Sequence, residues 1–256
     1  MSTVVLVHGA AMDSSVWRYQ ADALTQAGFT SIAVDLPGHG GSEGDPSSSA
    51  RGYAGWLLAY LSHLGEPVHL VGHSMGALVA LETAAARPDL VRSLTLIGVS
   101  DLMPVNPDLL AGAAEGDLSM FATMGKWMHA REPIGEPEWN VDDTVAVLQR
   151  ARPGVAFADL TACAGYPGAA AVAATISVPI LLILGEQDLM TKPSAAEPIA
   201  AAAVDATTVT VMGAGHLLPV ERPDVVNATL IEFLEKQVAR PETRDLRLET
   251  RTDSSP

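Results

Sequence analysis

Cysteine and basic residues are scarce in this sequence of 256 residues, and each scarcity excludes a class of protein. Cys163 is the single cysteine, so no disulfide can form within the chain and a small disulfide-bonded scaffold is excluded. Only 15 Lys and Arg stand against 30 Asp and Glu, which gives a formal net charge of −15. Because such a field repels phosphate backbones and anionic lipids, we expect no nucleic acid and no membrane as a partner.

Long hydrophobic runs are also lacking. No apolar run approaches the roughly 20 residues of a membrane helix, and the first residues lack the basic and apolar regions of a signal peptide. The seven histidines show no metal-ligand spacing, so we predict no metal and no cofactor. Since 48% of the residues are hydrophobic, a substantial core can still form, and we expect one cytoplasmic domain with an insertion.

Short aliphatic and β-branched runs alternate with helical segments along the chain. The runs predict buried strands at residues 4–7, 31–34, 68–71, 93–97, 180–184 and 207–211. Helices are predicted at residues 17–27, 51–64, 75–86, 193–203 and 223–239. This alternation indicates an α/β fold with a mostly parallel sheet of about six strands flanked by helices.

The alternation stops after residue 100. Residues 101–174 contain no clear buried strand, and prolines interrupt their helical patches, so we predict an inserted helical cap, or lid, over one end of the sheet. The core then consists of residues 1–100 and 175–239. Residues 240–256 are polar and charged without a sustained apolar face, and they predict a flexible C-terminal tail.

The sharpest motif is Gly72-His73-Ser74-Met75-Gly76, which lies between a predicted strand and a predicted helix. Gly-x-Ser-x-Gly in this context is a nucleophile elbow, a tight turn that holds the serine in a strained backbone conformation. The two glycines remove side chains that would collide in the turn. We therefore predict Ser74 as a nucleophile at the carboxyl edge of the sheet.

A serine nucleophile needs a histidine base and an orienting acid, which follow in the order Asp or Glu, then His. Asp188 follows the strand at residues 180–184, and His216 lies in a glycine-rich loop after the strand at residues 207–211. Asp101, at the end of the strand at residues 93–97, is an alternative acid. For the oxyanion hole we predict the backbone amides of Ala10, after the first strand, and Met75, after the nucleophile.

Together these motifs resemble the alpha/beta-hydrolase family, in particular its small serine esterases and haloperoxidase-like members. The matching residues are His8-Gly9, Asp35-Leu36-Pro37-Gly38-His39-Gly40-Gly41-Ser42, Gly72-His73-Ser74-Met75-Gly76, Gly185-Glu186-Gln187-Asp188 and Gly213-Ala214-Gly215-His216. Members usually have two strands before the His-Gly strand, whereas this sequence begins at it, so the resemblance implies a trimmed sheet. Haloalkane dehalogenases and epoxide hydrolases of this family use an Asp nucleophile, and Ser74 argues against both.

The resemblance implies a serine hydrolase, carboxylesterase-like, that acts through a Ser-His-Asp triad and an acyl-enzyme. Methionine and tryptophan side chains suggest a pocket for small to medium apolar esters; the candidates are Trp17, Met103, Met120, Met124, Trp127 and Leu217. The same triad also serves carbon–carbon bond hydrolases, lactonases, thioesterases and lyases, and these alternatives stay open. A slow-turnover ligand-binding receptor is the third hypothesis. The sequence does not distinguish a monomer from a homodimer.

Overall fold

The computed structural model describes residues 1–135 and 137–240, and within them six strands form one sheet. The strands are β1 (Thr3–Val7), β2 (Thr30–Val34), β3 (Val68–His73), β4 (Val91–Ile97), β5 (Ile180–Gly185) and β6 (Ala206–Val211). Their order across the sheet is β2-β1-β3-β4-β5-β6, and every pair is parallel. The predicted α/β fold is confirmed, and each predicted strand is present.

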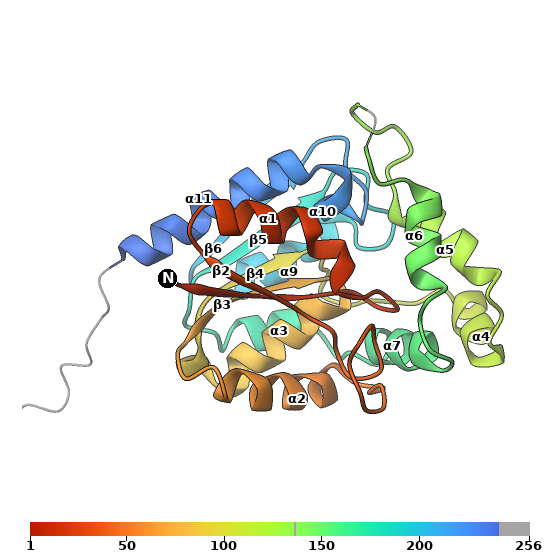
Figure 1. The fold of residues 1–256 in the computed structure, drawn as a ribbon, viewed down its shortest axis with the longest axis horizontal. Coiled ribbons are helices and arrows are strands. Elements are labelled where there is room, and N and C mark those ends of the chain that lie inside the picture. The colour runs from red at the N-terminus through yellow and green to blue at the C-terminus, as the bar shows by residue number, and fades with distance from the viewer. Residues whose placement is uncertain (136, 241–256) are drawn as a thin grey trace, which may run out of the picture.

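The connections between strands are helical. The α-helices are α1 (Arg18–Gln26), α2 (Ala50–Ser62), α3 (Met75–Ala86), α4 (Pro107–Glu115), α5 (Met120–Met128), α6 (Val141–Leu148), α7 (Val155–Ala164), α8 (Ala169–Ala173), α9 (Glu197–Ala202), α10 (Leu218–Glu221) and α11 (Pro223–Ala239). Short 3-10 helices are η1 (Ser14–Trp17), η2 (Pro88–Leu90) and η3 (Pro193–Ala196). Helices α1 and α11 pack together on one face of the sheet, and α2 and α3 pack together on the other (Figure 1).

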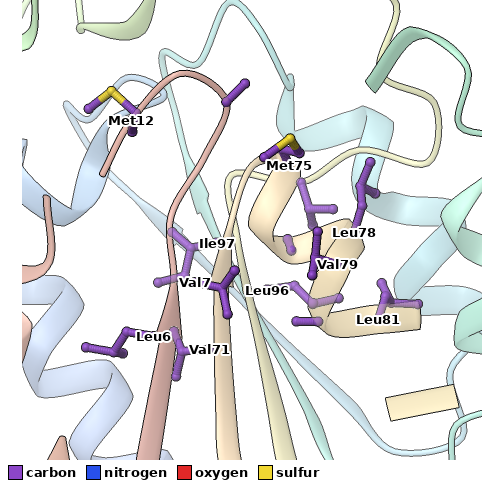
Figure 2. Packing of buried hydrophobic residues seen from close by; sticks show 14 of the residues in the cluster. Leu6, Val7, Met12, Val71, Met75, Leu78, Val79, Leu81, Leu96 and Ile97 are labelled. Carbon is purple, nitrogen blue, oxygen red and sulfur yellow. The ribbon is translucent and has the colours of Figure 1, made fainter. Parts of the chain in front are cut away.

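Strands β1 and β5 are buried on both faces, which is why they are almost entirely apolar. All five residues of β1 and all six of β5 are buried, as expected for a parallel sheet covered by helices on both sides. Figure 2 shows side chains of β1, β3 and β4 packed beside Leu78, Val79 and Leu81 of α3. At about 25 cal/mol for each Å² of apolar surface removed from water, this burial is the main stabilising contribution.

Helices α4 to α7, together with the segment from Met103 that leads into α4, lie between β4 and β5 in the sequence, and we call them the helical lobe. They lie beyond the carboxyl ends of the strands (Figure 1). The helix α6 begins with a capping box between Asn140 and Asp143, and α4 ends at Gly116 in the left-handed conformation. Helix α8 instead packs against α3 and α9. The lobe therefore stands where the loops of a parallel sheet converge.

The strand order places the loop after β1 beside the turn after β3. The chain starts at β1, adds β2 on one side, and then continues with β3 on the other side. Ligands of open α/β sheets bind at such a switch point, outside the carboxyl ends of the strands. The loop after β1 and the turn after β3 leave the sheet there.

The C-terminal helix α11 ends at Ala239, and Arg240 donates a hydrogen bond to Asp205 at 2.9 Å. The rest of the predicted C-terminal tail, residues 241–256, lies outside the described residues. No helix in the described ranges is long and apolar enough to cross a membrane.

Candidate active site

Ser74 lies in the sharp turn between β3 and α3, with φ of 53° and ψ of −119°. A non-glycine residue at positive φ is strained, and such strain concentrates at functional sites. The flanking glycines allow the turn. A Cβ on Gly72 would lie 2.2 Å from the carbonyl oxygen of Gly76, and a Cβ on Gly76 would lie 2.3 Å from that of Val7. The structure thus contains the elbow that the motif predicts.

Asp188 and His216 meet at the adjoining loops after β5 and β6. The Nδ1 atom of His216 donates to Oδ2 of Asp188 at 2.8 Å, and both side chains are almost completely buried. Their approach requires a glycine at the end of β5, because a Cβ on Gly185 would lie 2.0 Å from the carbonyl oxygen of Gly215. With Nδ1 carrying a proton, neutral His216 keeps Nε2 free to accept another.

Thr191 contacts both Asp188 and His216, and it was not predicted from the sequence. Its hydroxyl donates to Asp188 at 2.6 Å and lies 3.1 Å from Nδ1 of His216. The backbone amides of Met190 and Thr191 also donate to Asp188, each at 2.8 Å. Burial alone would raise the pKa of Asp188, but the charge of His216 and these hydrogen bonds outweigh it, and the net pKa is lowered. Asp188 is therefore held as a carboxylate beside the histidine.

His73, next to Ser74, supports the backbone of the histidine loop. Its Nε2 donates to the carbonyl oxygen of His216 at 2.8 Å, and the two rings lie 4.8 Å apart. Burial, followed by the charge of His216, lowers the pKa of His73 to about 3. It therefore stays neutral and acts as a hydrogen-bonding residue.

Glu221 is a second supporting residue that the motifs did not indicate. Its two carboxyl oxygens accept from the amides of Ala130, at 2.6 Å, and Gly215, at 2.9 Å. His129 lies 3.7 Å from the same carboxyl group. Burial raises the pKa of Glu221 to about 7. This side chain joins the end of α5 to the loop that carries His216.

Ser74 and His216 line one cavity of about 200 Å³, together with Gly9 and Ala10 from the loop after β1. No hydrogen bond joins the Ser74 hydroxyl to His216 among the described residues, and catalytic hydrogen bonds of this kind often form only with substrate bound. Met75 follows Ser74 as the first residue of α3, and its side chain is fully buried. Of the predicted catalytic and oxyanion residues, Ala10, Ser74 and His216 therefore converge on one cavity, while Asp188 is bonded to His216 behind it and Met75 is not among the described residues that line it.

The rest of the cavity is mainly apolar. Three predicted pocket residues line it, namely Met103, Met124 and Trp127. The sequence motifs did not indicate the other lining residues, most of which belong to the segment between β4 and β5, where no motif marks them. These are His73, Pro104, Val105, Asn106, Leu109, Met128, Leu160, Cys163, Leu189, Met190 and Thr191. Cys163 is buried, and burial raises the pKa of its thiol, so it remains protonated.

Three predicted pocket residues lie elsewhere. Trp17 is fully buried and packs edge-on against the ring of His73, with centroids 6.4 Å apart. Leu217 is also fully buried, and its amide donates to the carbonyl oxygen of Met128. Met120 is at the start of α5, one turn farther from the cavity than Met124, near Gly112 of α4. None of the three is among the described residues that line this cavity, because residue type alone does not fix the direction of a side chain.

The alternative acid, Asp101, does not contact His216. Its carboxylate accepts from the amide of Ala170 at 2.8 Å, at the start of α8, and its own amide donates to Ala195. This carboxylate has a structural partner of its own. Asp188 is thus the acid that the structure pairs with the histidine. Within the described ranges no group of three or more His, Cys, Asp or Glu side chains is arranged to hold a metal ion.

Comparison with known proteins agrees with the fold. Residues 4–229 match the alpha/beta hydrolase family, and the chain belongs to this family. The chain is 27% identical to the uncharacterized carboxylesterase nap of Bacillus subtilis, over 91% of this chain and 79% of the relative. It is 24% identical to the (E)-2-((N-methylformamido)methylene)succinate hydrolase of Acinetobacter baylyi, over 91% of this chain and 90% of the relative.

Among solved structures, the chain resembles an esterase from Thermogutta terrifontis, with a TM-score of 0.83 and 26% identity. The alignment covers 93% of this chain and 90% of the esterase. The family and these relatives together identify the chain as a hydrolase of the alpha/beta-hydrolase fold.

Proposed function

We propose that the protein is a serine carboxylesterase that hydrolyses compact, uncharged esters. One observation carries the proposal: Ser74, in a strained elbow, shares a cavity with His216, whose other ring nitrogen is bonded to Asp188. This is the arrangement of nucleophile, base and orienting acid that acyl transfer requires.

In the proposed reaction, Nε2 of His216 takes the Ser74 proton as the hydroxyl oxygen attacks the ester carbonyl carbon. The positive charge that forms on the imidazole is stabilised by Asp188, which is buried beside it. His216 then gives the proton to the leaving alcohol, and the acyl group remains on Ser74. Water, deprotonated by the same base, cleaves this acyl-enzyme and restores the serine.

The amides of Ala10 and Met75 form the proposed oxyanion hole. Neither amide is engaged by another described group, and Met75 is the first residue of α3, where a helix presents free amides and positive dipole character. Two fixed donors of this kind stabilise the negative charge that develops on the carbonyl oxygen in the transition state, and one donor is worth about 3 kcal/mol.

The cavity supports the choice of substrate. Its volume of about 200 Å³ fits a short acyl chain, and its walls are methionine, leucine, valine and tryptophan side chains. Neither lysine nor arginine is among the described residues that line it. A carboxylate buried there would have no cation to pair with and would pay a large desolvation cost. We therefore propose that succinate-type acids, which the name of the Acinetobacter relative includes, are poor substrates.

The helical lobe, which supplies many of these apolar residues, is the proposed cap. Met103 to Leu109 and helices α5 and α7 would contact the substrate, while the core supplies the reacting groups. The proposed partner of the protein is thus a small molecule that enters between lobe and sheet.

A matched pair of p-nitrophenyl esters tests the proposal. Butyrate and hemisuccinate esters have acyl groups of similar length, but only the second carries a charge. We expect kcat/KM at least tenfold higher for the butyrate, with no turnover above background by Ser74→Ala. A folded wild-type enzyme without ester turnover, or a Ser74→Ala variant that retains it, would contradict the proposal. Turnover of a lactone, thioester or vinylogous diketone in place of esters would favour the alternative hydrolase reactions.

A further inference from the structure

The proposed reaction does not use Asp159, although this acidic residue is buried close to the cavity. It lies on α7 in the helical lobe, and it has no exposed surface. Its neighbours on the helix, Leu160 and Cys163, line the cavity. Isolated buried carboxylates are costly, so the hydrogen bonds of this side chain need an explanation.

The carboxylate of Asp159 joins three distant parts of the chain. Oδ2 accepts from the backbone amide of Ala11 at 2.7 Å and lies 2.7 Å from Nε2 of His39. Oδ1 accepts from the Tyr53 hydroxyl at 2.5 Å. Burial alone would lower the pKa of His39, but the hydrogen bond and charge of Asp159 outweigh it and the net pKa is raised. This one carboxyl group therefore connects α7 of the lobe to the loop after β1, to the His39 loop and to α2 of the core.

Ala11 has an unusual backbone conformation. Its φ is +56°, and among the described residues only Ala11 and Ser74 combine a side chain with a positive φ. Such a conformation costs on the order of 1–3 kcal/mol and persists where the surroundings hold it. The hydrogen bond to Asp159 is a contact that does so, because it binds the amide of the strained residue itself.

The strained residue adjoins the proposed oxyanion donor. The Gly9 carbonyl oxygen lies 2.9 Å from Nδ1 of His8 and accepts from the Met12 amide at 3.3 Å. Burial lowers the pKa of His8 to about 4, and its Nε2 accepts from an amide, so Nδ1 carries the proton and donates. In a trans peptide the N–H points away from the carbonyl oxygen. The Ala10 amide therefore points away from these contacts.

We propose that Asp159 is a positioning residue that holds the loop of residues 8–12 so that the Ala10 amide faces the reacting carbonyl. The inference rests on the proposed function, because it assigns the residue that orders the oxyanion hole for acyl transfer. It also links the two sides of the site. The same helix lines the cavity with Leu160 and Cys163 and holds the loop through Asp159, so displacement of α7 displaces an oxyanion donor.

Two substitutions at the same hydrogen-bond cluster test the proposal. Asp159→Asn keeps the size of the side chain but weakens the bond to the Ala11 amide, because the charge is lost. Tyr53→Phe removes a bond to the other oxygen of the same carboxylate and leaves the Ala11 bond in place. We expect kcat for p-nitrophenyl butyrate to fall about 100-fold in Asp159→Asn with KM within about threefold, as for the loss of an oxyanion donor. Tyr53→Phe should keep kcat within about threefold.

Amide hydrogen exchange in the wild-type protein gives a readout that does not depend on turnover or on a variant that folds. In NMR spectra the Ala11 amide should exchange at least 100-fold more slowly than the Ala10 amide. Equal exchange of the two amides would overturn the proposal, as would a folded Asp159→Asn enzyme with wild-type kcat. Equal losses of kcat in both variants would also overturn it, because they would indicate a structural role only. If wild-type protein shows no ester turnover, the proposed function fails, and the exchange measurement still decides whether Asp159 holds the loop.

Discussion

The two sides of the cavity are built on different principles. On the core side, Ser74, His216 and Ala10 are fixed by strained backbone, close glycine contacts and buried hydrogen bonds. On the lobe side, Met103, Met124 and other apolar residues are held mainly by packing. A hydrogen-bonded constellation tolerates almost no displacement, whereas an apolar wall adapts to a different shape at modest cost. This difference suggests that the core determines the reaction and the lobe determines the substrate.

The largest effect is expected on the core side, at Asp188, the acid of the proposed triad. Asp188→Asn should lower kcat by about 10⁴-fold, because the neutral amide neither fixes the tautomer of His216 nor stabilises its charge. Asp101→Asn is the matched control, since Asp101 also follows a core strand but bonds only to backbone. Steady-state kinetics should show that this control keeps kcat within about twofold. Equal losses in the two variants would remove Asp188 from the mechanism.

Acid should destabilise both regions through buried histidines. Burial lowers the pKa of His8 and His69 in the core, and of His129 in the lobe, each to about 4. The unfolded chain takes up protons near the ordinary value of 6.5, so between pH 6.5 and 4 it binds more protons than the folded protein. Stability is therefore lost as the pH falls through this window.

Each unit of pKa difference corresponds to about 1.4 kcal/mol for each histidine. Glu221 acts in the opposite direction, because its pKa is raised from 4.5 to about 7 and the folded state binds the extra proton. The raised pKa of His39 acts in the same direction as that of Glu221, whereas the pKa of His73, lowered to about 3, adds to the loss. Glu221 and His39 do not offset the four histidines whose pKa is lowered, so we expect a net loss of several kcal/mol. Urea unfolding at a series of pH values measures the free energy. A free energy of unfolding that is constant from pH 6.5 to 4.5 would contradict this prediction.

The smallest effect is expected on the lobe side, and it concerns selectivity. Met124→Ala removes part of the cavity wall, so kcat/KM for a hexanoate ester should rise about tenfold relative to the butyrate. Met120→Ala, on the same helix but away from the cavity, is the control. Both variants should unfold more easily, by about 2–5 kcal/mol, but only the first should change the chain-length preference. A similar change of chain-length preference in Met120→Ala would show that the selectivity depends on the packing of the whole lobe and not on the cavity wall at Met124.

The extent to which sequence predicts structure also differs between the two regions. The core strands were predictable because parallel strands covered on both faces must be apolar throughout, as β1 and β5 are. Ser74, Asp188 and His216 were predictable because each follows a strand, and the carboxyl ends of parallel strands share one edge. In these elements one requirement, burial of the strands within a parallel sheet, determines both the local sequence pattern and the position in the fold.

The sequence of the helical lobe is under no comparable constraint, so it does not predict which side chains face the cavity. Met120 and Met124 are one helical turn apart on α5, yet of the two only Met124 lines the cavity, because the start of α5 is farther from the cavity than the turns that carry Met124 and Met128. Thr191 and Asp159 were missed for another reason, since their roles depend on partners that the fold alone brings near. Asp159 is 148 positions from the Ala11 amide that it accepts from. Contacts at this separation leave no periodic trace in a single sequence.

The proposed nucleophile can be tested directly by covalent labelling. The folded protein is incubated with a fluorophosphonate, and the intact mass and the labelled peptide are determined by mass spectrometry. If Ser74 is the nucleophile, we expect one added phosphonyl group, located on Ser74, and none on the Ser74→Ala variant. Folded wild-type protein that remains unlabelled, or a label on another residue, would contradict the assignment of Ser74 as the nucleophile.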